Sequence, residues 1–289
     1  MLLKFGLLFA ISVAWAAGYL FIGAARHVPP ITATAVMTIV GAIVIAGSVR
    51  FGFGHALLPD LKKRPWVPAV MAVSAIALPN LAVVAAEHTV PADLAAVLGT
   101  TVPIATILLT TFVTRQSAFS TVRMLGIVVA LSGLVIFVGG WAALTDDPAD
   151  LDGMLIMMAG GLVFALNGLL AAHQTRDLNP HVLAAWTIIF GAVALSLAAL
   201  ILEQPFSVEL GSAVWPLVAE GSLGMGVAYL GYYVLVARAG AAFASLYAFL
   251  VPVFGVVGSA IVLGEQLTTH HVAGLFVVLG GLALLTKGK

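Results

Sequence analysis

Long apolar runs, separated by short polar or proline-bearing breaks, fill almost the whole chain. A helix that crosses the hydrocarbon core of a bilayer needs roughly 20 mostly apolar residues, and ten runs approach or reach that length. They cover residues 5–25, 31–51, 66–86, 94–113, 122–144, 153–172, 182–202, 215–237, 243–263 and 271–286. The pattern therefore predicts an all-α polytopic membrane protein with ten transmembrane helices. The connections are too short to hold a soluble domain.

The first apolar run has a second interpretation, because Lys4 followed by apolar residues could be a cleavable signal peptide. The apolar core of a signal peptide is typically about 7–15 residues long, and this run is longer. The internal repeat described below also uses this segment. We therefore expect it to remain in the protein as the first transmembrane helix.

The charged residues sort by sign between the two sides of the predicted bundle. With the N-terminus inside and the loops numbered alternately, eleven of the twelve lysines and arginines lie on the cytoplasmic side, and only Arg26 lies on the other. Cytoplasmic loops retain cations because moving them across the bilayer is costly. The distribution predicts cytoplasmic N- and C-termini and a multi-pass protein of the bacterial cell inner membrane.

Composition indicates the same solvent. Hydrophobic residues make up 62% of the chain and charged residues 8%, against roughly 25% charged in a typical soluble domain. The mean hydropathy is +1.16. The formal net charge is zero, which gives no bulk attraction to nucleic acid. The chain has no cysteine, so disulfides and thiolate metal sites are excluded.

A shift of 149 residues overlays the two halves of the chain. The matched positions are prolines, glycines and one aromatic segment: Pro103 with Pro252, residues 15–19 with 164–168, and, after a one-residue slip, Gly126 with Gly274 and Gly133 with Gly281. Each half has five predicted helices, an odd number, so the second half must be inverted relative to the first. We expect one repeat over 1–144, an external linker over 145–152, and the inverted repeat over 153–289. Such repeats place the substrate site near the bilayer midplane, at the interface between halves.

Short motifs in both halves resemble a known family. The second half contains Leu250-Val-Pro-Val-Phe-Gly, Leu263-Gly-Glu-Gln-Leu, and Gly274, Gly280 and Gly281; the first half contains Trp15, Pro103, Gly126 and Gly133. Together they resemble the EamA family of the drug/metabolite transporter superfamily. The first half departs from the family at Thr114-Arg115-Gln116-Ser117, where a second Leu-Gly-Glu would be expected.

This resemblance implies a five-plus-five inverted repeat, with helices 1, 3, 4, 6, 8 and 9 around a central cavity. Within the family, the chain is most similar to the YddG-type amino-acid exporters, which favour aromatic amino acids.

Aromatic and polar side chains inside the predicted spans are the candidates for binding substrate. A buried hydroxyl or amide needs a hydrogen-bond partner, and a proline in mid-span frees a backbone carbonyl, so both suit a polar cavity. The candidates are Trp15, Tyr19, Pro79, Asn80, Thr100, Thr101, Asn167, Tyr229, Tyr232, Tyr233 and Tyr247. Ordinary helix-to-helix packing is the alternative interpretation for each of them.

Glu220 is the only acid clearly inside a predicted span, and it is the candidate for coupling transport to protons or cations. An acid early in a helix also suits the helix dipole, which is the structural alternative. The seven histidines lie in or beside loops without metal-site spacing, so we expect no metal and no cofactor. With so few ionisable groups in the spans, we expect facilitated diffusion or exchange, with proton antiport through Glu220 as the rival.

These features favour a transporter over an enzyme. No aspartate lies in a span, and Glu87-His88 lacks the second histidine of a helical zinc site. Phosphate-bearing solutes would need lysine or arginine near the site, and none lies in mid-span. We expect export of small neutral or zwitterionic metabolites, amino acids including aromatic ones, by alternating access.

The expected partners are a small-molecule substrate and the lipid bilayer, without nucleic acid, for a monomer or homodimer. Two alternatives stay open. The first is a carrier of another metabolite class, such as sugars or nucleotide-type solutes. The second is a structural or receptor-like membrane protein that transports nothing.

Overall fold

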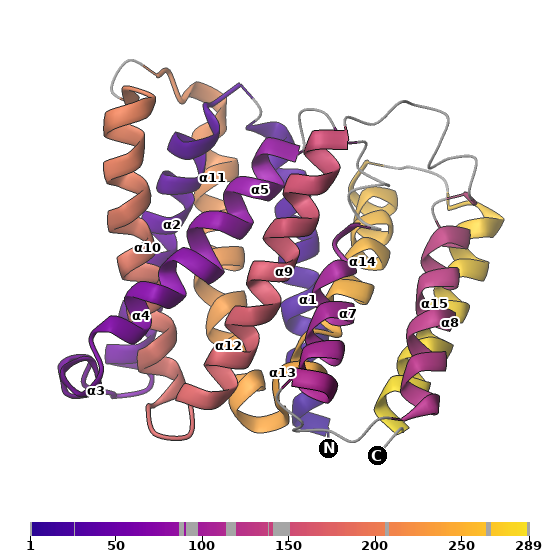
Figure 1. Cartoon of the computed structure of the whole chain (residues 1–289). Coiled ribbons are helices and arrows are strands. Elements are labelled where there is room, and N and C mark those ends of the chain that lie inside the picture. Colours follow the sequence, from indigo (N-terminus) through magenta and orange to yellow (C-terminus); the bar gives the residue numbers. More distant parts are fainter. Residues whose placement is uncertain are drawn as a thin grey trace.

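Helices form all the regular secondary structure in the part of the chain that the structure, a computed structural model, describes (Figure 1). That part comprises residues 2–25, 27–86, 90, 98–113, 120–137, 139–140, 151–205, 208–263 and 267–287. Within it, seven helices are long and apolar enough to cross a membrane, and three more are apolar but shorter. The all-helical membrane fold agrees with the hydrophobic pattern.

The helices follow the chain in two sets. The first set is α1 (Leu2–Ala24), α2 with η1 (Pro30–Gly47, Ser48–Gly52), the short α3 (Leu58–Lys63), the composite helix α4–η2–α5 (Trp66–Met71, Ala72–Ala77, Leu78–Ala86), α7 with η3 (Thr101–Leu108, Leu109–Val113) and α8 (Thr121–Phe137). The second set is α9 (Leu151–Gln174), α10 (Pro180–Leu202), the composite helix η6–α11–η7–α12 (Gly211–Ala213, Val214–Glu220, Gly221–Ala228, Tyr229–Ala239), α13 (Ala241–Ala244), α14 (Tyr247–Leu263) and α15 (Thr269–Lys287). Every predicted span contains an observed helix.

The hydrophobic pattern did not predict two features of the structure. The break at residues 55–65, predicted as a loop, contains α3, which has a proline in its first turn and two lysines in its last, both favourable positions. The spans at 66–86 and 215–237 each change to a wider π-helical segment, η2 and η7. Both spans are apolar on nearly all faces, so the extra residue per turn leaves no trace in their hydrophobicity.

Several predicted features lie outside the described residues. They are Arg26, the Glu87-His88 pair, residues 114–117, most of the predicted linker at 145–152, and Glu265.

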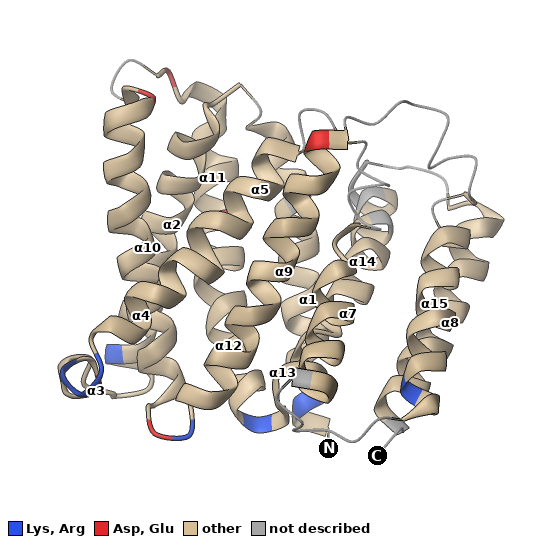
Figure 2. Cartoon of the chain, in the orientation of Figure 1, with Lys and Arg blue, Asp and Glu red and all other residues tan. Residues whose placement is uncertain are grey.

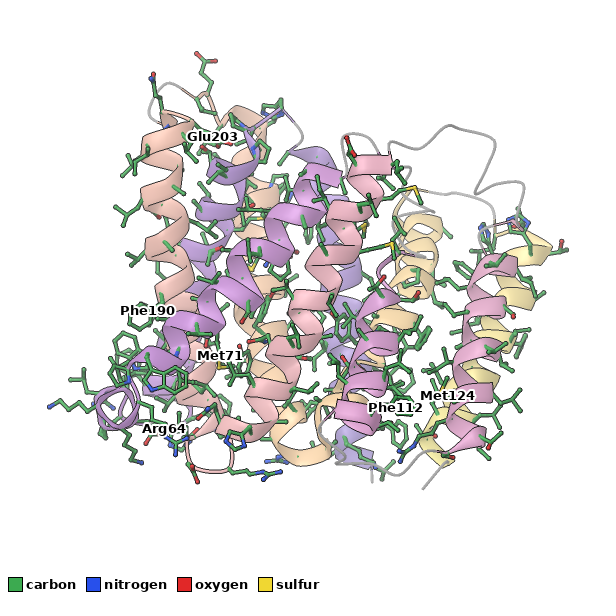
Figure 3. All side chains as sticks on the ribbon, viewed as in Figure 1. Arg64, Met71, Phe112, Met124, Phe190 and Glu203 are labelled. Atoms are coloured by element: carbon green, nitrogen blue, oxygen red, sulfur yellow. The ribbon has the colours of Figure 1, made fainter. Side chains whose placement is uncertain are left out.

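Lysine and arginine gather at one end of the helix bundle, the end at which α1 begins and α15 ends (Figures 1 and 2). Arg64 lies at this end and Glu203 at the opposite one (Figure 3). The arrangement agrees with the sorting of charges between predicted loops, because both ends of the described chain lie on the cation-rich side.

A carboxylate caps the start of a long helix at each end of the bundle. At the end away from the cations, Glu203 accepts hydrogen bonds from the backbone N–H groups of Ile31 and Thr32, at 3.0 and 2.7 Å, and from the Thr32 hydroxyl at 2.8 Å. At the cationic end, Asp60 of α3 accepts the N–H of Asn179 at 3.0 Å, where α10 begins. Each carboxylate thus satisfies N–H groups that a helix start leaves without a partner.

Further hydrogen bonds at the cationic end join the segment around α3 to the turn before α10. Arg64 donates to Gln174 and to Asp177, both at 2.7 Å. Burial alone would raise the pKa of Asp60, but the hydrogen bonds from Lys63 and from a backbone N–H outweigh it and hold that pKa below its ordinary value. These contacts fasten the connection between η1 and α4 to the turn between α9 and α10.

Helices α8 and α15 pack closely through small residues. A Cβ added to Gly133 would lie 2.5 Å from the backbone nitrogen of Val278, and one added to Gly281 would lie 2.5 Å from that of Ala130. The two contacts are reciprocal, since Gly133 and Gly281 are 148 residues apart and so are Ala130 and Val278. Glycine permits this approach because it carries no side chain.

We expect Gly281→Ala to lower the Tm in detergent by several degrees, because overpacking a tight contact costs about 1–3 kcal/mol. Gly280 is the matched control: it is the preceding residue of the same helix, and nothing lies within 4 Å of an added Cβ. Gly280→Ala should leave the Tm unchanged or slightly raised. Equal Tm values for the two variants would contradict this packing of α15 on α8.

Candidate functional site

Five aromatic side chains from four helices converge on one another, and we call them the aromatic cluster. They are Trp15 of α1, Phe164 of α9, Tyr229 and Tyr232 of α12, and Tyr247 of α14. The ring centroid of Trp15 lies 4.3 Å from that of Tyr247, 5.4 Å from Tyr229, 5.7 Å from Tyr232 and 6.2 Å from Phe164. The pairs with Tyr229 and Phe164 are edge-to-face, a geometry that aromatic rings prefer, and the pairs with Tyr232 and Tyr247 are tilted.

The rings of the aromatic cluster are unequally buried. The exposed fractions of Tyr229, Tyr232 and Phe164 are 4%, 1% and 4%, whereas Trp15 and Tyr247 are half-buried. A molecule approaching the aromatic cluster would therefore meet Trp15 and Tyr247 first. It would find ring edges and faces suited to another apolar or aromatic group.

Hydrogen bonds of Tyr229 link the aromatic cluster to the α4–η2–α5 helix, at a point where a proline interrupts that helix. In a regular α-helix the carbonyl of Ala75 would accept the N–H of residue 79, but residue 79 is Pro79, which has none. The Tyr229 hydroxyl donates to this carbonyl at 2.7 Å. Asn80 Nδ2 donates to the Tyr229 oxygen at 3.1 Å and to the Ile76 carbonyl at 2.8 Å. Asn80 and Tyr229 thus stabilise an irregular segment from opposite halves of the chain.

A second polar group lies beside the aromatic cluster. Tyr233 packs edge-on against Tyr232, with centroids 5.9 Å apart, and Asn167 follows Phe164 by one helical turn of α9. The Ser74 hydroxyl of η2 lies 3.3 Å from the Asn167 amide oxygen. Asn167 and Tyr233 are almost completely buried, at 1% and 0% exposure.

Glu220 is buried although it comes early in its span. It is the last residue of α11, and its side chain is 4% exposed. Its carboxylate packs against two glycines: a Cβ added to Gly18 of α1 would lie 2.5 Å from Oε2, and Gly224 of η7 contacts the other oxygen. Any larger residue at these positions would collide with the carboxylate, so the two glycines make room for it.

Two predicted site residues, Pro79 and Thr101, pack instead at the interface with α9. A Cβ added to Gly160 would lie 3.5 Å from Pro79 Cα, and one added to Gly161 would lie 3.2 Å from Thr101 Cβ. Thr100 is 3% exposed at the start of α7. The contacts of Pro79 and Thr101 with the glycines of α9 are those of helix packing.

The structure brings together Trp15, Asn80, Tyr229, Tyr232 and Tyr247, and places Asn167 and Tyr233 beside them. The Tyr19 side chain lies outside the described part of the molecule. Phe164 was missed by sequence reasoning, yet the 149-residue repeat lays it on Trp15 and could have identified it. Among the described residues, no group of three or more His, Cys, Asp or Glu side chains could hold a metal ion.

Comparison with known proteins places this chain among transporters. A model of the EamA-like transporter family matches it twice, over residues 3–139 and 151–287. The uncharacterized transporter YoaV of Bacillus subtilis (strain 168) is 28% identical over 182 residues, which are 61% of this chain and 62% of YoaV. The uncharacterized inner membrane transporter YedA of Escherichia coli (strain K12) is 26% identical over 294 aligned positions, covering 99% of this chain and 91% of YedA. The chain thus spans less than two thirds of YoaV but most of YedA.

A solved structure described as "Crystal structure of protein" has the same arrangement of helices. It superimposes with a TM-score of 0.80, covering 97% of this chain and 95% of its own, at 19% sequence identity. Such a low identity supports a shared fold and nothing beyond it.

Proposed function

The chain belongs to the EamA-like transporter family, and we propose that it exports small neutral or zwitterionic metabolites, including aromatic amino acids, across the bacterial inner membrane. The aromatic cluster carries this proposal, because its rings offer an apolar or aromatic side chain favourable edge and face contacts. The similarity of the sequence to YddG-type exporters favours the same substrate class. Its family and its relatives indicate a membrane transporter rather than an enzyme.

We further propose that the ten apolar helices are ten spans arranged as two inverted halves. The two family matches support this, since each covers one half of the chain. Contacts between positions 149 residues apart support it too: Asn80 bonds to Tyr229, and Trp15 touches Phe164. Positions on a two-fold axis meet their own counterparts, as they do at a symmetric interface.

Inverted halves can give alternating access, because each half can adopt the arrangement of the other. Tyr229 here bonds to the carbonyl of Ala75. In the exchanged state, Asn80 would bond instead to the carbonyl of Gly224, which follows Ala75 by 149 residues. The Asn80–Tyr229 pair would thus change partners as the substrate site opens to the other side.

A counterflow assay in proteoliposomes, with a panel of amino acids, sugars and phosphorylated solutes, tests the substrate class. We expect exchange of aromatic amino acids and none of phosphorylated solutes. Phosphate sites favour arginine or lysine, and these side chains gather at the end of the bundle (Figure 2). Exchange of sugars alone would replace amino acids as the proposed substrate, and no exchange at all would favour a structural or receptor role.

The proposed orientation predicts the location of both termini. A reporter enzyme fused after Lys289 should be active only when that reporter works in the cytoplasm, because the cation-rich end of the bundle should remain inside. A pair of reporters with opposite compartment requirements provides the control. Activity of the periplasmic reporter at this position would overturn the orientation and the ten-span arrangement together.

A further inference from the structure

Two hydrogen-bond donors beside the aromatic cluster have no partner. Among the described residues, Asn167 Nδ2 and the Tyr233 hydroxyl are buried and make no hydrogen bond. Folded proteins pair nearly all such groups, because a buried donor without an acceptor costs free energy. Two such donors from neighbouring helices therefore indicate a site that takes an acceptor from outside the described chain.

The hydroxyl groups around these donors give their own protons to other acceptors. The Tyr233 hydroxyl lies close enough to Asn167 and to Thr187 of α10 to interact with both electrostatically. Within the described part of the chain, neither the hydroxyl nor Asn167 Nδ2 completes a hydrogen bond. The Thr187 hydroxyl donates a hydrogen bond to the Leu183 carbonyl at 2.8 Å. Ser74 lies 3.3 Å from the Asn167 amide oxygen, so the amide nitrogen is the unused side of that group. What remains is one N–H donor group and one O–H donor, which suit an oxygen with lone pairs.

The donor pair occurs once in the chain rather than once in each half. The positions 149 residues before Asn167 and Tyr233 are Gly18 and Val84, which carry no side-chain donor. The pair is therefore not required by the repeated architecture. Its position next to Tyr232 and one turn from Phe164 joins it to the aromatic cluster.

We propose that Asn167 and Tyr233 form a subsite that binds an acceptor oxygen of the transported solute, such as a carboxylate oxygen, while the aromatic cluster receives its apolar part. This inference rests on the proposed function and deepens it, since it orients the solute in the site. Neutral donors suit a single carboxylate, whereas a phosphate would favour arginine. The subsite thus selects for solutes with both an apolar part and an oxygen acceptor.

Tyr233→Phe is the sharpest test, because it removes the hydroxyl and keeps the ring. We expect the KM for phenylalanine counterflow to rise about tenfold or more, as for a lost hydrogen bond to a charged group. Exchange of phenylethylamine, which lacks the carboxylate, should be weak in the native protein and no weaker in Tyr233→Phe. The Tm should be unchanged or higher, because the hydroxyl has no protein partner to lose. Asn167→Leu should show the same selectivity.

Ser12→Ala is the matched control. Its hydroxyl is also fully buried, but it is bonded to the Leu8 carbonyl of its own helix at 2.7 Å, so transport should be unchanged. A fall in the Tm of Tyr233→Phe with unchanged transport would overturn the subsite and assign the donors a structural role. An equal loss for phenylalanine and phenylethylamine would overturn it as well.

The subsite can be tested even if the panel of amino acids is not transported and the proposed substrate class fails. Acetate is then the probe, as the smallest carboxylate, with chloride at equal ionic strength as the control. If the subsite binds carboxylates, acetate should raise the Tm of the native protein and not that of Tyr233→Phe. The same response to acetate in both proteins would reject the inference.

Discussion

Trp15→Ala is expected to lower the counterflow efficiency for an aromatic amino acid by roughly 10- to 100-fold. Trp15 and Phe164 each contact all four other members of the aromatic cluster, but only Trp15 of these two is half-buried, so a solute can reach it. Burying an aromatic side chain is worth about 1.5–3 kcal/mol, and each 1.4 kcal/mol is about tenfold in affinity. Trp15→Phe should retain part of the activity, because it keeps one ring.

Trp215→Ala provides the control for tryptophan removal. Trp215 is 68% exposed and touches only Phe21 among the described rings, at 5.9 Å between centroids. Its loss should leave counterflow close to the native level. Gel filtration in detergent shows whether each variant remains folded and monodisperse. Full activity in a folded Trp15→Ala protein would make the aromatic cluster a packing feature and remove the main support for the substrate site.

The helices were predictable because length and apolar content alone define a span. The prediction at 66–86 coincides with the observed span Trp66–Ala86. Four of the five rings of the aromatic cluster were predicted as well, since tyrosine and tryptophan stand out within apolar spans. Phe164 was not, because phenylalanine is ordinary in such a span. Only the 149-residue repeat, which aligns Phe164 with Trp15, distinguishes it from the other phenylalanines in the spans.

The contacts between helices could not be predicted from the sequence. Asn80 and Asn167 look alike in the sequence, yet Asn80 supports a broken helix while the amide nitrogen of Asn167 has no partner. Pro79 and Thr101 lie within predicted spans but pack against the glycines of α9. Such differences depend on the rotation of each helix about its axis, which an apolar span without a polar face does not specify.

Glu220 changes the expectation for energy coupling. Its position near the start of a span suited the helix dipole, and the few ionisable groups in the predicted spans favoured transport without coupling. Its side chain is instead 4% exposed and packs against Gly18, one turn after Trp15 on α1. An ionised carboxylate is costly to bury, so an acid kept inside a membrane protein is a functional candidate. A carboxyl that gains and loses a proton against α1 could therefore couple protonation to solute release at Trp15.

We therefore expect Glu220 to drive proton antiport, with one proton entering for each solute that leaves. Proteoliposomes whose interior is one pH unit more acidic than the exterior should accumulate solute up to about tenfold, since one pH unit is worth 1.36 kcal/mol. Glu220→Gln keeps the shape of the side chain but cannot exchange a proton, so it should retain counterflow and lose accumulation. Glu209→Gln, which changes an exposed acid, should accumulate solute like the native protein. If the native protein fails to accumulate solute, or if Glu220→Gln still does, transport runs on the solute gradient or on another group.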